Sequence, residues 1–176
     1  MSDRKLIDAA VLVPVFRENN GELKLILIKR SDHGVHGGQL AFPGGKYEPG
    51  DKSLYETALR ETEEEVGLQR TDVKYLTELP SIDTVSTGYK IHPFLGKISP
   101  FKAWILQEEE IAEVLEVSVN ELALDETHTT GMFRFEDWIE PREISYYKVG
   151  SYQLWGATYK IVKGLLPRLL NNEFEI

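Results

Sequence analysis

The feature that most constrains this chain is a glycine pair that leads into an acidic helix, within residues 44–68. Ser53 followed by Glu56 forms a capping box, which predicts where the helix starts. Gly67 stands where a glycine commonly ends a helix. One face of the helix is predicted to pack against the protein, through Tyr55, Leu59, Thr62 and Val66.

The opposite face of this helix carries Glu61, Glu64 and Glu65 at i, i+3 and i+4, so the three carboxylates project together. Like charges this close destabilise a bare helix unless a cation lies between them. A run of glutamates is most often a solvated helix face. Carboxylates are, however, preferred ligands of hard cations such as Mg²⁺, and the glycine pair beside the cluster favours a metal site.

The whole segment resembles the Nudix box, in which a glycine, five residues, a glutamate and seven residues precede R-E-U-x-E-E-x-G-U, where U is a bulky aliphatic residue. The matching positions are Gly45, Arg60, Glu61, Glu64, Glu65, Gly67 and Leu68. Two positions depart from the pattern. Asp51 replaces the first glutamate and is separated from Arg60 by eight residues rather than seven, and Thr62 replaces the first aliphatic residue.

The resemblance implies metal-dependent hydrolysis of a pyrophosphate bond, with Mg²⁺ or Mn²⁺ held by Glu61, Glu64 and Glu65. In Nudix hydrolases a backbone carbonyl of the glycine loop often joins the carboxylates, and Gly44 is the matching residue. Glycines also let the backbone approach an ion or a phosphate closely, so we expect Gly45 to contact substrate. Asp51 could help through a water molecule.

Arg60 and the general base have alternative interpretations. Arg60 could hold a glutamate in position by a bidentate contact, or it could form a surface ion pair of little energetic consequence. The family resemblance favours the first, which makes Arg60 part of the catalytic apparatus. For the general base, Glu64 and two residues of a later loop, Glu126 and His128, are all candidates.

The segment just before the box, residues 27–46, is similar to the signature of the coenzyme A pyrophosphatase branch of the family. The matching positions are Arg30, Ser31, Phe42, Pro43, Gly44 and Gly45, and the extra residue before Arg60 is typical of that branch. Residues 87–93 and 154–158 look like further segments of it. We therefore expect Arg30 and Ser31 to contact substrate, although a strand end running into a loop would also explain them.

Three hypotheses for the function remain. The first is coenzyme A or an acyl derivative, giving 3′,5′-ADP and a phosphopantetheine. The second is ADP-ribose or another nucleoside diphosphate derivative, because the chain is one residue short after Arg30 and has Val35 near an expected arginine. His33, His36 or Lys29 could replace that arginine. The third is a Nudix-fold nucleotide-binding protein without turnover, which the intact glutamates disfavour.

The whole chain, residues 1–176, is predicted to form one domain of α+β class. Strands are predicted at residues 7–16, 23–29, 39–42, 73–78, 90–98, 111–119, 132–138 and 144–149. A final helix is expected from about Gln153 to Leu170, with Pro167 kinking or shortening its end. The resemblance sharpens this class to the Nudix α/β/α sandwich, a mixed sheet with flanking helices.

The composition argues against some classes of binding partner but does not identify a specific one. The net charge of −9 argues against broad nucleic-acid binding, so the expected partner is a small nucleotide substrate. The sequence has neither 18 consecutive apolar residues nor an apolar signal-peptide core, which predicts a cytoplasmic protein without membrane contact. Zero cysteines exclude thiol chemistry. Nudix hydrolases are often dimers, and the aromatic-rich segment from Trp138 to Trp155 could supply a homodimer interface.

Overall fold

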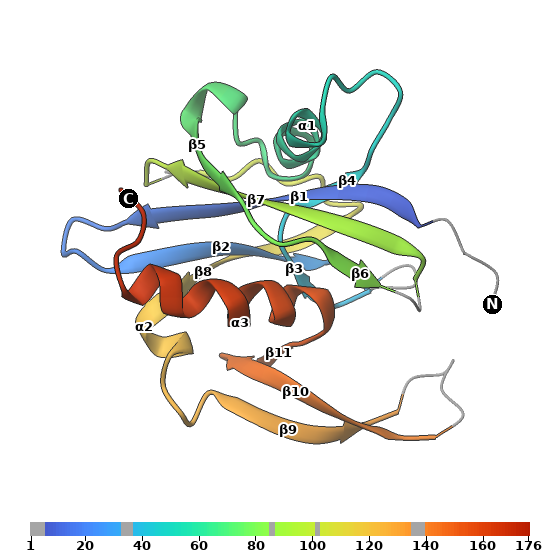
Figure 1. The fold of residues 1–176 in the computed structure, drawn as a ribbon, viewed down its shortest axis with the longest axis vertical. Coiled ribbons are helices and arrows are strands. Elements are labelled where there is room, and N and C mark those ends of the chain that lie inside the picture. The colour runs from blue at the N-terminus through green and yellow to red at the C-terminus, as the bar shows by residue number, and fades with distance from the viewer. Residues whose placement is uncertain (1–5, 33–36, 85–86, 101–102, 135–139) are drawn as a thin grey trace.

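The structure is a computed structural model and describes residues 6–32, 37–84, 87–100, 103–134 and 140–176. A large mixed β-sheet forms the middle layer (Figure 1). Helix α1 (Leu54–Val66) covers one face of that sheet, and α3 (Gly156–Leu170) covers the other. The predicted α+β class and the sandwich of a mixed sheet between helices are therefore confirmed.

The large sheet has eight strands, and its main path runs β3-β2-β1-β7-β5. Strand β4 pairs with β1, β6 with β7 and β8 with β2. Only the β1–β7 pair is parallel among the pairings in this sheet of the described chain. The strands are β1 (Ile7–Arg17), β2 (Leu23–Arg30), β3 (Leu40–Ala41), β4 (Gly44–Lys46), β5 (Val73–Glu78), β6 (Ile82–Thr84), β7 (Tyr89–Ile98) and β8 (Ile111–Ser118).

A smaller antiparallel sheet lies beyond α3, with the strand order β11-β10-β9 (Figure 1). Its strands are β9 (His128–Phe133), β10 (Arg142–Val149) and β11 (Tyr152–Leu154). The short helix α2 (Val119–Leu122) connects β8 to this sheet, and a 3₁₀ turn at Arg70–Asp72 precedes β5.

The alternation of side chains along β2 separates the two hydrophobic cores. Ile26 and Ile28 belong to the core beneath α1, whereas Leu25 and Leu27 belong to the core shared with α3 and the small sheet. Both cores are fully closed at these positions, since all four residues have 0% exposure. The same alternation decides which way the charged end of β2 faces.

Most predicted elements are confirmed, including the end of the last helix at Leu170, but two start positions were wrong. The last helix begins at Gly156, because Gln153 and Leu154 pair with β10 as part of β11. Helix α3 also continues through Pro167 to Leu170, so this proline near the final turn does not shorten it. The strand predicted at residues 132–138 is observed as His128–Phe133, and residues 135–139 lie outside the described residues.

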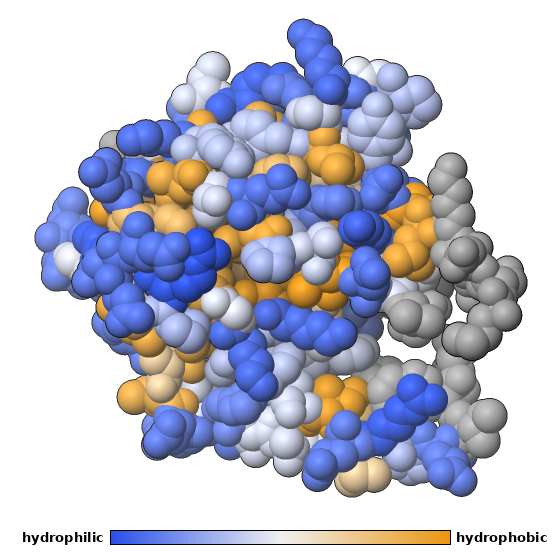
Figure 2. Space-filling view, viewed as in Figure 1, coloured by the Kyte–Doolittle hydropathy of each residue, from blue (hydrophilic) through white to orange (hydrophobic). Residues whose placement is uncertain are grey.

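The sequence patterns also missed short elements that tertiary pairing creates. Gly44–Lys46 reads as a turn but forms β4 by pairing with β1, and the three-residue β6 pairs with β7. The face in Figure 2 is mainly hydrophilic, with apolar residues visible in separate patches. Among the described residues, no helix is long and apolar enough to cross a membrane.

Candidate active site

Helix α1 is positioned by caps at both ends. The Ser53 side chain accepts a hydrogen bond from the Glu56 N–H at 3.2 Å. Gly67, at φ 75°, donates its N–H to the Glu63 carbonyl at 3.0 Å. Both features match the predicted capping box and C-terminal glycine. Leu59, Thr62 and Val66 are buried, so the predicted packing face holds the helix against the sheet.

Glu65 lies between this packing face and the predicted metal face. It is only 2% exposed, and its Oε2 accepts a hydrogen bond from the Gly44 N–H at 2.9 Å. Burial raises the pKa of the Glu65 carboxyl to about 8, although the Gly44 N–H and the Arg30 guanidinium act in the opposite direction. The buried carboxylate is thus short of positive charge, an environment that suits a bound cation.

The glycine pair allows the backbone of β4 to lie against α1. Gly44 has a φ of 152°, and an added Cβ would collide with the Ala10 carbonyl and come within 2.5 Å of the Val11 Cα. At Gly45 an added Cβ would lie 2.5 Å from Oε1 and 2.6 Å from Oε2 of Glu61. The missing side chain at Gly45 therefore makes room for a carboxylate of the candidate site.

Arg60 is held by residues on both sides of the site. Its Nε and Nη2 donate to Oδ1 and Oδ2 of Asp51 at 2.9 and 3.1 Å, and Nη2 also donates to the Lys46 carbonyl. Its Nη1 lies 3.0 Å from Glu61 Oε1 and 3.3 Å from Glu64 Oε2. Arg60 therefore connects the loop before α1 to two of the three glutamates.

The Asp51 carboxylate is bound by groups of the protein itself. The sequence had suggested instead that it could assist a metal through a water molecule. Besides Arg60, its carboxylate accepts from the Thr57 hydroxyl at 2.8 Å and from the Glu48 N–H at 3.0 Å. The Arg60 guanidinium, with these two donors, holds the pKa of the Asp51 carboxyl well below its usual range. These contacts place the Asp51 carboxylate where it can orient the Arg60 guanidinium.

The carboxylates of the site are paired with arginines, and their chemistry suits a divalent cation. In the described parts of the chain, no three Asp, Glu or His side chains are gathered closely enough to hold an ion as they stand. Glu61 and Glu64 are instead paired with Arg60, and Glu65 with Arg30. The donor chemistry nevertheless fits a hard cation, because carboxylates from adjacent helical turns meet a glycine backbone in which a Cβ would not fit.

The loop that precedes β8 adds a carboxylate that sequence reasoning missed. Ile105 and Gln107 donate their N–H groups to the carbonyls of Val66 and Glu65, which docks this loop on the end of α1. After burial, the charge of Glu110 is among the causes that raise the pKa values of Glu61 and Glu65. The glutamates at 108–110 were visible in the sequence, but no spacing rule relates them to the box.

Arg30 and Ser31 occupy different surroundings at the end of β2. The Arg30 Nη1 lies 3.9 Å from Glu65 Oε1. The Ser31 hydroxyl donates to the Glu109 carbonyl at 2.8 Å, and the Ser31 N–H donates to the Glu110 carbonyl at 2.7 Å. Arg30 thus reaches the carboxylates directly, whereas Ser31 fixes the loop that carries Glu110.

Of the residues that could replace the arginine missing near position 35, the structure describes Lys29. Lys29 pairs with Asp32 at 3.6 Å and lies over the Tyr152 ring. It belongs to the alternate set of β2 side chains and so faces away from Arg30. Val35, His33 and His36 lie outside the described residues.

Two of the three candidate bases lie away from α1. His128 is the first residue of β9, and its ring stacks on Tyr159 of α3 and contacts Tyr147 of β10. Glu126 lines a groove between β8, α2 and the β10–β11 turn. Figure 1 shows that α1 and β9 lie on opposite sides of the large sheet. This arrangement leaves Glu64 as the candidate on the helix.

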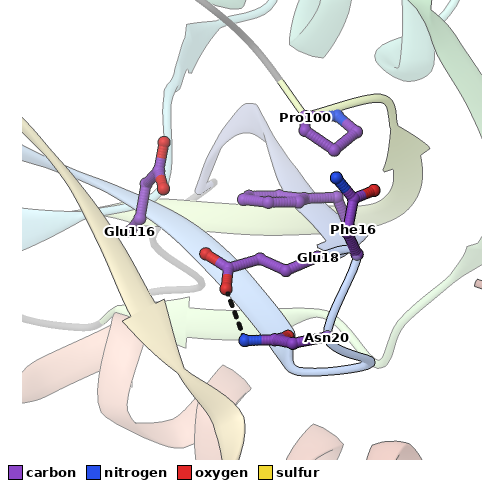
Figure 3. Close-up of a pocket in the computed structure, with 6 residues that line it drawn as sticks. Phe16, Glu18, Asn20, Pro100 and Glu116 are labelled. Carbon is purple, nitrogen blue, oxygen red and sulfur yellow. Dashed lines mark hydrogen bonds between the residues drawn. The ribbon is translucent and has the colours of Figure 1, made fainter.

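Hollows elsewhere on the surface do not include the carboxylates of α1. The groove that contains Glu126 has a volume of about 710 Å³. A second hollow, of about 350 Å³, lies at the β1–β2 turn. Figure 3 shows its lining, in which Asn20 donates to Glu18 beside Phe16, Pro100 and Glu116. The carboxylates of α1 line neither of these two hollows, and the candidate site is formed by α1, β4 and the end of β2.

Comparison with known proteins decides the family. The model of the NUDIX domain matches residues 6–139 of the chain. This chain belongs to the Nudix hydrolase family. An uncharacterized Nudix hydrolase, NudL from Yersinia pestis, is 37% identical over 164 residues, which span 92% of this chain and 79% of NudL.

Solved Nudix structures share the fold at low sequence identity. A MutT/nudix family protein from Enterococcus faecalis gives a TM-score of 0.61 at 20% identity, covering 98% of this chain and 64% of that protein. An Ap4A hydrolase from Caenorhabditis elegans gives a TM-score of 0.54 at 19% identity, covering 65% and 82%. Nudix hydrolases act on small-molecule nucleotide substrates and generally use divalent metal ions, and membership of the family supports action of this chain on a nucleoside diphosphate derivative.

Proposed function

We propose that this Nudix hydrolase cleaves the pyrophosphate bond of coenzyme A or an acyl-coenzyme A, giving 3′,5′-ADP and a phosphopantetheine. The observation that carries the proposal is the position of Arg30, whose guanidinium lies 3.9 Å from Glu65 at the carboxylate site. Arg30 belongs to the segment that resembles the coenzyme A branch. An arginine next to metal-ligating carboxylates is suited to bind a substrate phosphate.

The roles of the glutamates follow from their burial. We assign Glu61, Glu64 and Glu65 to the metal, together with the Gly44 carbonyl. A bound Mg²⁺ or Mn²⁺ would neutralise the pyrophosphate oxygens and favour formation of hydroxide from water. Glu64 has a side chain that is 54% exposed, so it can also meet a water molecule and accept its proton. Attack by that water on phosphorus breaks the bridging P–O bond, and the second phosphate leaves.

Arg60 and the glycine loop complete the proposed site. Arg60 contacts Glu61 and Glu64 directly and is fixed by Asp51, so its role is to position the two carboxylates. Gly45 makes room for the Glu61 carboxylate beside the backbone, and we assign the backbone of this glycine to contact with substrate phosphate. Ser31 supports the substrate segment through its bonds to the loop at Glu109 and Glu110.

ADP-ribose or a nucleoside diphosphate sugar is the second candidate substrate. Val35 stands near the place where the coenzyme A signature has an arginine, which weakens recognition of a further phosphate. The carboxylate chemistry would be the same for both substrates. A third candidate, nucleotide binding without turnover, is disfavoured by the retention of all three glutamates.

The test is a comparison of kcat/KM across substrates, with products identified by mass spectrometry and with Mg²⁺ and Mn²⁺ supplied separately. The panel contains coenzyme A, acetyl-coenzyme A, ADP-ribose, GDP-mannose and a diadenosine polyphosphate. The proposal predicts that coenzyme A or its acetyl ester has the highest kcat/KM and yields 3′,5′-ADP. A higher value for ADP-ribose or GDP-mannose would replace it with the second candidate, and no turnover would favour the third.

A further inference from the structure

Arg30 is directed towards α1 by the backbone of β2. Residues two apart on a strand share a face, so Arg30 follows Ile26 and Ile28, which lie in the core beneath α1. The pairing register with β8 shifts between Lys29 and Arg30, which places Arg30 opposite Ile111 of the same core. The extra residue, Ala112, lies in β8, so the alternation along β2 continues to Arg30.

The contact of Arg30 with Glu65 occupies one end of a buried carboxylate. Glu65 Oε2 is bound to the Gly44 N–H, and Oε1 faces the Arg30 Nη1 at 3.9 Å. The Glu65 side chain is 2% exposed, whereas that of Arg30 is 35% exposed. The carboxylate therefore sits in a fixed position, while the guanidinium reaches it from the solvent side.

The two arginines of the site differ in how firmly they are held. Arg60 is anchored by the bidentate contact with Asp51 and by the Lys46 carbonyl, in addition to its glutamate contacts. Within the described part of the chain, the contact with Glu65 is the only ion pair of Arg30. At 3.9 Å it is longer than a hydrogen bond. Arg30 can therefore leave its partner at lower cost than Arg60.

We propose that Arg30 is an exchangeable partner of Glu65, which occupies one oxygen of this side chain in the metal-free protein and releases it when a divalent cation binds. The released guanidinium is then available to the substrate phosphate, so that metal binding prepares the substrate site. This inference rests on the proposed metal-dependent function. Because the guanidinium and the metal compete for one carboxylate, Arg30 must lower the affinity of the protein for the metal.

If Arg30 competes with the metal, its removal should raise the affinity for the metal, whereas loss of a structural contact would lower it. In Arg30→Gln, the metal-free protein should bind Mn²⁺ about three- to tenfold more tightly than the wild type, measured by isothermal titration calorimetry. At saturating Mn²⁺ the same variant should show a raised KM for coenzyme A. Arg30→Lys, which keeps the charge, should bind Mn²⁺ nearly as the wild type does.

Lys29→Gln is the matched control. It removes the same charge from the neighbouring residue, but Lys29 faces the other side of β2 and pairs with Asp32. Its Mn²⁺ affinity should change by less than about twofold, because the charge is more distant and screened. A second test adds Arg30→Gln to Glu65→Gln, in which the gain in affinity should disappear.

Each outcome supports or overturns the inference. If Arg30→Gln binds Mn²⁺ no more tightly than Lys29→Gln while the wild type binds it, Arg30 does not compete with the metal and the inference is wrong. If the wild type binds neither Mn²⁺ nor Mg²⁺, the proposed function itself fails. Circular dichroism checks folding, and Arg30→Met, which keeps the aliphatic stem, decides the question if the glutamine variant unfolds.

Discussion

Arg60 and Asp51 form a bidentate ion pair, with Nε to Oδ1 at 2.9 Å and Nη2 to Oδ2 at 3.1 Å. The remaining nitrogen, Nη1, reaches Glu61 and Glu64. The guanidinium is therefore fixed on one edge while its other edge orients two of the proposed metal ligands. The aspartate that departs from the box pattern thus acts on the site through Arg60.

Replacing Asp51 with Asn should consequently impair catalysis without touching a proposed metal ligand. The amide retains only part of the hydrogen bonding, so Arg60 loses its orientation towards Glu61 and Glu64. We expect kcat to fall about tenfold or more. Steady-state kinetics at saturating Mg²⁺ would measure this, and Asp51→Glu tests whether a longer carboxylate restores the rate. An unchanged kcat in Asp51→Asn would mean that Arg60 does not position the glutamates.

The same ion pair predicts a dependence of stability on pH. The folded-state pKa of Asp51 is depressed, so its contribution to stability is fully present above the unfolded-state value of about 3.9. It is lost as the pH falls below that value, towards the lower pKa of the folded state, because the unfolded chain then binds the proton first. The difference in unfolding free energy between wild type and Asp51→Asn should be largest at neutral pH.

Urea unfolding of both proteins between pH 7 and pH 3 checks this prediction. The wild-type advantage at pH 7 should be about 2 kcal/mol, since the Asp51 side chain is 7% exposed and that of Arg60 22%. It should become smaller towards pH 3. An advantage that is constant over this range would contradict the assigned pKa shift.

The space beside Glu61 gives a prediction that separates fold from function. In Gly45→Ala the added methyl would stand where the Glu61 carboxylate lies, so this side chain must move. We expect turnover to fall about tenfold or more, because a small displacement of a catalytic group is costly. Gly50→Ala is the control, since nothing lies within 4 Å of a Cβ there. Equal turnover in both variants would show that the position of Glu61 is not critical.

The structure shows which parts of this site could be inferred from local sequence. The capping residues Ser53 and Gly67 and the packing face of α1 depend on spacing within one helix, and they were predicted correctly. The burial of Glu65 depends instead on β4, whose Gly44 N–H lies against its carboxylate. No helical periodicity contains that information.

The other differences between the sequence-based predictions and the structure also arise from pairing between distant segments. Whether a residue such as His128 lies beside α1 or across the sheet is decided by the topology of β9, and the residue itself carries no sign of it. Leu154 looks helical by composition, yet pairing with Tyr147 of β10 places it in a strand. The partnership of Asp51 with Arg60 likewise required the conformation of the loop before α1.

Glu110 is a candidate residue of the site whose charge only the fold brings near Glu61 and Glu65. Its negative charge should strengthen cation binding at Glu61 and Glu65, so Glu110→Gln should weaken Mn²⁺ binding about three- to tenfold. Glu109→Gln removes the same charge from the neighbouring position and serves as the control. Calorimetric titration of both variants measures the difference. Identical affinities would remove Glu110 from the site.

The proposed function requires that the carboxylates of α1 form a metal-dependent hydrolytic centre for coenzyme A. Its most direct test is release of 3′,5′-ADP from coenzyme A by Glu64→Gln and Glu63→Gln, each assayed with Mg²⁺ and after chelation. Glu63 is adjacent, but it pairs with Arg70 at 3.7 Å outside the site. We predict that Glu64→Gln loses activity about a hundredfold or more while remaining folded, that Glu63→Gln keeps near-wild-type activity, and that chelation abolishes turnover. Comparable activity in the two variants, or turnover that survives chelation, would contradict the account.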